Sequence, residues 1–156
     1  MNSTRLEHPK FLLVLFVISV ALNYIWEIAQ APLFAGMDSS GALRWHCFVA
    51  SLGDGIILWI IQGLGWATFK RWNWSVSLGY RQIAFMVSAS FVITILIEWF
   101  AVYWQHRWAY TDSMPRIPVL NVGLTPILQM LILTPLIFLL THKFLALLKQ
   151  NTLRNG

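Results

Sequence analysis

Charged residues are scarce in this chain. Only 11% of its 156 residues are Asp, Glu, Lys or Arg, and 58% are hydrophobic, whereas an ordinary soluble domain carries about 25% charged residues. This composition excludes a soluble globular domain. Four apolar runs account for nearly the whole chain, and each approaches the roughly 20 residues that a helix needs to cross a bilayer. They cover residues 11–34, 45–69, 82–104 and 119–141.

The sequence also lacks the short alternating segments of a membrane barrel. Open strands at membrane depth would leave backbone groups without hydrogen bonds, and the four runs are too long and continuous for barrel strands. The runs leave no room for a soluble domain. We therefore predict one membrane domain over residues 1–156, an all-α integral membrane protein built as a four-transmembrane-helix bundle.

Cysteine occurs once, as Cys47. A single cysteine excludes an internal disulfide and any mechanism that needs two thiols. No residue next to it in the sequence would activate the thiol, so we interpret Cys47 as a small packing residue.

Acidic residues are few, since six Asp and Glu stand against eleven Lys and Arg. Eight of these basic residues precede the first run, separate the second from the third, or follow the fourth. The positive-inside rule then places both termini in the cytoplasm and the 35–44 and 105–118 loops outside. We expect a bacterial cytoplasmic membrane. The other three basic residues are Arg44, Arg107 and Arg116.

Two segments have competing interpretations. The first run resembles a secretory signal with a cleavage site at 29–31, but Pro32 directly after that site disfavours cleavage. The loop 70–81 alternates aromatic and basic residues, a pattern also found in nucleic-acid-binding proteins. Between two membrane helices we interpret it as an interfacial aromatic anchor, and we expect no nucleic-acid partner. A second aromatic belt is expected at the outer surface, formed by Trp99, Tyr103, Trp104, Trp108 and Tyr110.

Three carboxylates lie inside the apolar runs, namely Glu27, Asp54 and Glu98. At 1.5 Å per residue all three fall roughly 9–13 Å beneath the outer surface. Each belongs to a stripe of polar residues on one helix face, as with Asn23 and Gln30 around Glu27. A carboxylate at this depth is unfavourable unless it is paired, protonated or hydrated. We therefore predict that the three acids converge on a buried polar site.

Acid–base catalysis is the chemistry that such a site suits best, because one carboxyl group can hold a proton while another receives one. We predict Glu98 and Glu27 as the acid–base pair, with Asp54 orienting them. The substrate would be a membrane lipid or an isoprenoid-like molecule. The 105–118 loop is the expected lid. Substrate contacts are expected from Trp26 and Trp99 beside the acids, from His106 and Arg107 at the rim, and from Gln30, Asn121 and Gln129 as polar positioning groups.

A metal site uses overlapping residues but has a weaker pattern. The pairs His46 with Asp54 and Glu98 with His106 are each eight residues apart, whereas helical metal pairs are normally separated by three or four. We expect no metal, and the sequence identifies no cofactor. We interpret His8 and His142, at the cytoplasmic ends, as solvated interfacial residues.

Other functions remain open. Buried acids also mark proton or metal-ion transport paths, although the cytoplasmic half lacks matching acids and four short helices leave little room for alternating access. The polar stripes can also join helices in an accessory, assembly or ligand-binding subunit. Either function would require a second copy of this chain or another membrane protein as a partner.

Overall fold

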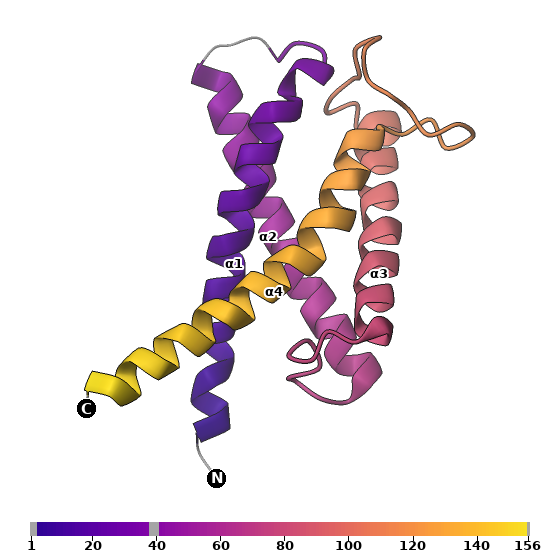
Figure 1. Ribbon diagram of the computed structural model, residues 1–156. Coiled ribbons are helices and arrows are strands. Elements are labelled where there is room, and N and C mark those ends of the chain that lie inside the picture. Colours follow the sequence, from indigo (N-terminus) through magenta and orange to yellow (C-terminus); the bar gives the residue numbers. More distant parts are fainter. Residues whose placement is uncertain (1–2, 38–40, 156) are drawn as a thin grey trace.

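The chain folds into four long α-helices in the computed structural model, which describes residues 3–37 and 41–155. The helices are α1 (Ser3–Gln30), α2 (Gly41–Phe69), α3 (Tyr80–Trp99) and α4 (Leu124–Asn155) (Figure 1). A 3-10 turn, η1 (Ala31–Leu33), extends α1, and a π-helix, η2 (Phe100–Trp104), extends α3. The described ranges contain isolated bridges but no strand. The predicted all-helical fold is confirmed.

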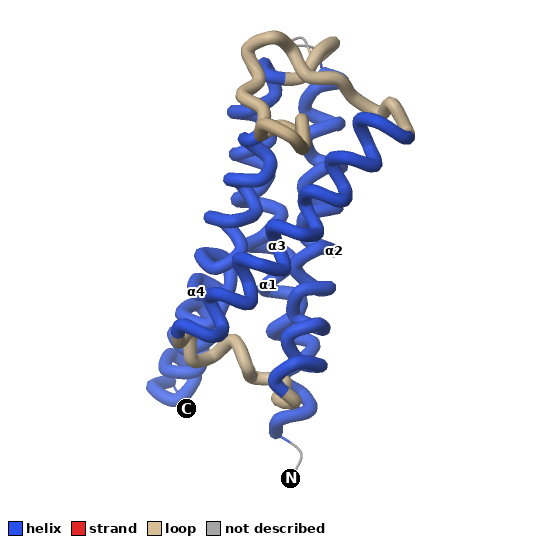
Figure 2. The backbone as a smooth tube through the Cα atoms, turned by 90° about the vertical axis from the view of Figure 1, so that its right-hand side faces the viewer, coloured by secondary structure: helices blue, strands red, loops and turns tan. Residues whose placement is uncertain are grey.

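Each helix is long and apolar enough to cross a membrane, as predicted. The candidate spans are His8–Leu33, Leu43–Phe69, Tyr80–Trp104 and Leu124–Thr152. In Figure 1 both termini lie at the same end of the bundle as the loop between α2 and α3. The long loop between η2 and α4 lies at the opposite end, as the tan segment at the top of Figure 2 shows. The four helices therefore return the chain to the end of the bundle at which it began.

Helix α4 packs against both α1 and α3. Helix α1 packs along α2, while α4 begins beside α3 and crosses α1 towards its own C-terminal end (Figure 1). The apolar core lies where these helices meet and includes Leu15, Leu58 and Ile137, which are fully buried. Loops connect the helices at both ends of the bundle.

Trp74 fills the core at the end that carries the termini, although it comes from a loop. Its side chain is 0% exposed, its ring centroid lies 5.3 Å from those of Phe69 and Phe85, and its Nε1 donates to the Gln62 carbonyl at 3.1 Å. The interpretation of the 70–81 loop as an interfacial anchor is therefore wrong for Trp74. Gly65 lies directly beneath the indole, where a β-carbon would overlap it.

The start of α4 differs from the prediction of a span from 119 to 141. Val119 and Asn121 have φ values of 75° and 51°, a left-handed backbone that a right-handed helix cannot contain. The helix therefore begins at Leu124 and continues to Asn155. Pro126 falls in its first turn, where no backbone N–H needs an intrahelical partner.

The start of α1 also differs from the prediction, because the helix begins at Ser3 and includes Pro9. Proline leaves one carbonyl of the preceding turn without its intrahelical partner, a loss that water can repair near a membrane surface. At its other end α1 stops at Gln30, and Pro32 lies in the 3-10 turn η1.

Candidate functional site

Gln129 of α4 connects three helices through its side-chain amide. Its Nε2 donates to Asn23 Oδ1 of α1 at 2.9 Å and to Asp54 Oδ2 of α2 at 3.1 Å. Its Oε1 accepts from Gln30 Nε2 of α1 at 2.9 Å. The same Gln30 amide donates to Glu27 Oε1 at 2.9 Å. The polar stripes of three helices thus meet in one hydrogen-bonded network around Gln129.

Glu98 of α3 is held by the loop that follows its helix rather than by the Gln129 network. The carboxyl group is buried, with the residue 6% exposed. Its Oε2 accepts from the Tyr110 hydroxyl at 2.5 Å and from Trp108 Nε1 at 3.5 Å. Trp108 and Tyr110, which were predicted to belong to an outer aromatic belt, both supply donors to a buried acid.

The three carboxyl groups lie within electrostatic range of one another. Asp54 interacts with both Glu27 and Glu98, and Glu27 interacts with Glu98. Their hydrogen-bond partners among the described residues are amides, a phenol and an indole, with no Lys or Arg. The fold therefore brings together three acids from three helices without a compensating cation.

The loop from 105 to 123 is fastened to the end of α1 and covers Glu98. The Ala35 N–H donates to the Ala109 carbonyl at 2.8 Å, and the Thr111 N–H donates to the Leu33 carbonyl at 3.0 Å. The ring of Phe34 contacts the rings of Trp108 and Tyr110. These contacts fix the positions of both donors to Glu98.

Tyr110 remains a donor at neutral pH. Burial, reinforced by the nearby charge of Glu98, raises the pKa of the Tyr110 phenol above its usual range. The Arg116 guanidinium lies 5.5 Å from the centroid of the Tyr110 ring. The sequence did not predict the contact between Tyr110 and Glu98. Tyr110 lies in the loop that follows α3 and η2, and this loop folds back over α3.

Thr94 has an unusual environment one turn before Glu98 on α3. Its hydroxyl is the one buried side-chain polar atom in the described residues that has no hydrogen-bond partner, and the residue is 5% exposed. Other helical hydroxyls here donate to the carbonyl four residues earlier, as Ser51 and Thr141 do. Buried polar groups are normally paired, so the Thr94 hydroxyl is an exception among the described residues.

The other predicted contact residues lie in different surroundings. Trp26 joins the network, because its Nε1 donates to Gln30 Oε1 at 3.2 Å. Trp99 is 50% exposed and its ring pairs with that of Tyr103. Asn121 is exposed and engages Tyr103 through its backbone carbonyl. His106 and Arg107 are exposed in the loop beside the site, with Arg107 over the Trp108 ring.

The metal candidates do not come together. In the parts of the chain that the structure describes, no group of three or more His, Cys, Asp or Glu side chains is placed to hold a metal ion. His46 is exposed on α2, and His106 is exposed in the loop that covers Glu98. Asp54 and Glu98, the other two weak candidates, belong to the carboxyl cluster described above. Cys47 is buried, as expected of a packing residue.

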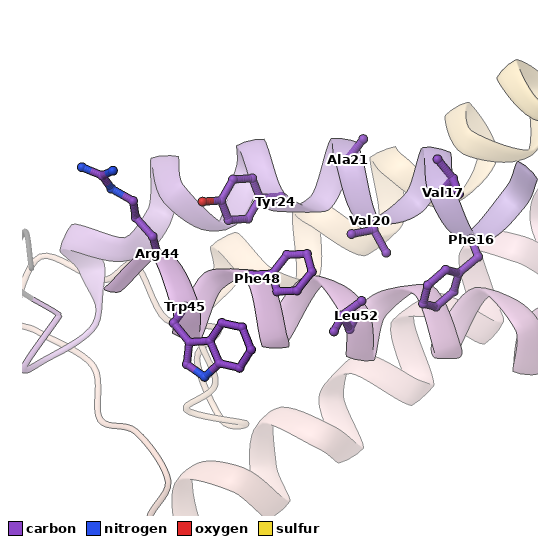
Figure 3. A pocket seen from close by; sticks show the side chains of 9 residues that line it. All are labelled: Phe16, Val17, Val20, Ala21, Tyr24, Arg44, Trp45, Phe48 and Leu52. Atoms are coloured by element: carbon purple, nitrogen blue, oxygen red, sulfur yellow. The ribbon is translucent and has the colours of Figure 1, made fainter. Parts of the chain in front are cut away.

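A separate groove runs between α1 and α2, with a volume of about 800 Å³ (Figure 3). Its walls are apolar, and Arg44 lies at one end, close to Tyr24 and Trp45. None of the three carboxylates lines it.

Comparisons with protein-family models, with curated proteins and with solved structures find no match to this chain.

Proposed function

We propose that this chain is an integral membrane enzyme that transfers protons on a lipid or isoprenoid-like substrate. The observation that carries the proposal is the Gln129 network, which joins Glu27 to Asp54, together with the buried Glu98 on α3. The unpartnered Thr94 hydroxyl, one turn from Glu98, supports a ligand at this place. Helices joined only for stability would gain the same cohesion from amides, without placing three acids in the candidate membrane spans.

Isomerisation is the reaction class that these groups suit. One carboxyl group adds a proton to a carbon of a double bond, and a carboxylate removes a proton from a neighbouring carbon. Substrate and product then have the same composition, so the step needs no oxidant, reductant or co-reactant. We assign Glu98 and Glu27 as the acid and base, because a hydrogen bond holds one carboxyl oxygen of each in position.

The remaining residues have supporting roles in this proposal. Asp54 receives its hydrogen bond from Gln129 and acts as an orienting partner. Gln30 positions Glu27, and Tyr110 positions Glu98. His106 and Arg107, exposed beside the lid, are placed to meet a polar head group at the membrane surface.

The proposed reaction can be tested by analysing the lipids of cells that produce the protein. We expect the wild-type chain to change the amount of at least one lipid or isoprenoid species, and Glu27→Gln and Glu98→Gln to reduce that change by at least about 100-fold, the lower range of acid–base contributions. Mass spectrometry of extracted lipids measures both. Asp112→Asn is the matched control, because Asp112 is exposed in the loop. An unchanged product level in Glu98→Gln would remove the proposed acid.

A second candidate, a non-enzymatic accessory or ligand-binding subunit, is favoured by the Gln129 network, whose members already satisfy one another between helices. Native mass spectrometry of protein extracted in mild detergent separates the two. A stoichiometric second membrane protein supports the subunit, whereas a chain isolated without one, together with a lipid change that Glu98→Gln abolishes, supports the enzyme.

The proposal places the site near the extracytoplasmic face of a bacterial cytoplasmic membrane, with both termini inside. In a Cys47→Ala background, we expect a membrane-impermeant maleimide to label Ser113→Cys in intact cells. Ser77→Cys should react only after the cells are opened. Both positions are exposed, one in each end loop. The opposite pattern of labelling would move the site to the cytoplasmic face.

A further inference from the structure

A second cavity, of about 920 Å³, lies at the end of the bundle that carries the termini. It is formed by the start of α1, the loop between α2 and α3, and the last turns of α4. This is the end opposite to the loop between η2 and α4, which supplies the donors to Glu98 (Figure 1). The cavity is therefore independent of the proposed catalytic site.

Hydrogen bonds hold one wall of this cavity in place. The His142 Nε2 and the Ser75 hydroxyl are 3.0 Å apart. The same hydroxyl donates to Gln62 Oε1 at 3.4 Å, and Gln62 Nε2 donates to the Trp72 carbonyl at 2.8 Å. The imidazole of His142 also stacks on the ring of Phe11, with centroids 5.0 Å apart. His142 is thus a partly buried part of the wall, and its interpretation as a solvated interfacial residue is wrong.

Positive charge surrounds the opening. Lys10 of α1 and Lys149 of α4 both line the cavity and are exposed. His8 lines it as well, with its ring 4.5 Å from that of Trp72. No acidic side chain occurs among the described lining residues. Two lysines from opposite ends of the chain line this cavity, and positive charge at an opening attracts anions.

Apolar side chains also line the cavity, and they indicate which kind of anion it would bind. Phe11, Leu145 and Leu148 line it beside the lysines. A free inorganic anion makes no favourable contact with apolar side chains. A phospholipid, in contrast, places its phosphate at the membrane surface and its acyl chains against apolar walls. We propose that this cavity binds an anionic phospholipid, with its phosphate between Lys10 and Lys149 and an acyl chain along Phe11 and Leu148.

The test measures lipid retention by the full chain in detergent. Native mass spectrometry after addition of phosphatidylglycerol should show bound lipid on the wild type, and less after addition of phosphatidylcholine. Lys10→Ala/Lys149→Ala should retain about tenfold less phosphatidylglycerol, since each basic residue contributes separately to anionic lipid binding. Both lysines are exposed, so the variant keeps the packed core; monodisperse elution on size exclusion verifies this.

Lys70→Ala/Lys143→Ala is the matched control, because it removes the same charge from exposed positions outside the cavity. Retention equal to wild type in this control supports the proposal. Equal losses in both double variants would show general attraction to a basic surface, and would overturn it. Thermal stabilisation by inorganic phosphate that depends on Lys10 and Lys149, without lipid retention, would also overturn it by identifying the free ion as the ligand.

Discussion

Replacing Trp74 by alanine is expected to lower the free energy of unfolding by about 3–5 kcal/mol, the range for removal of a large buried aromatic side chain. The indole is fully buried, contacts the rings of Phe69, Phe85 and Phe138, and donates to the Gln62 carbonyl. Its loss leaves a cavity and removes the hydrogen bond to the Gln62 carbonyl. For a chain of this length the midpoint of thermal unfolding should fall by about 6–20 °C in detergent.

The control for this substitution is Trp104→Ala, because Trp104 is 70% exposed. Its unfolding midpoint should remain close to that of the wild type. A pair of glycine variants tests the same packing from the other side. Gly65→Ala places a methyl group against the Trp74 indole and should destabilise the chain, whereas Gly63→Ala meets nothing within 4 Å. Equal midpoints for the two glycine variants would contradict the close contact between α2 and Trp74.

Hydropathy carried enough information to predict the four helices. Each run had to satisfy its own backbone in an apolar environment, so its length and composition were sufficient. The exception was the start of α4, where the apolar segment at Val119 and Leu120 looked like the beginning of a span. Two residues with left-handed backbone, Val119 and Asn121, keep that segment out of the helix. A pattern of apolar residues cannot report such local conformations.

The meeting of Glu27 and Asp54 at Gln129 was predictable from depth, because rise per residue converts sequence position into height. The residues that hold Glu98 were not, since Trp108 and Tyr110 come from a loop whose path is set by contacts with the end of α1. The packing of Trp74 and the cavity wall around His142 were not predicted either, because both depend on the path of the loop between α2 and α3. Helix periodicity places residues on faces, but only tertiary contacts place loops.

Gln129→Leu is expected to lower the free energy of unfolding by about 2–5 kcal/mol, because it leaves two polar atoms inside the bundle without their hydrogen-bond donor. These are Asn23 Oδ1 and Asp54 Oδ2, whereas the Gln30 amide keeps its hydrogen bond to Glu27. Leucine has a similar size, so little of the effect arises from a cavity. Thermal unfolding in detergent measures the loss, and Gln105→Leu, at an exposed position, is the control.

The double variant Asn23→Leu/Gln129→Leu tests whether Gln129 serves helix packing alone or also the proposed proton transfer. Replacing both partners of a hydrogen bond by apolar side chains is far less costly than removing one, so this variant should recover part of the stability lost in Gln129→Leu. Asp54 stays without its amide donor in both variants. If Gln129 orients Asp54 for proton transfer, product formation stays low after stability returns. Product formation that recovers together with stability would assign Gln129 to helix packing alone.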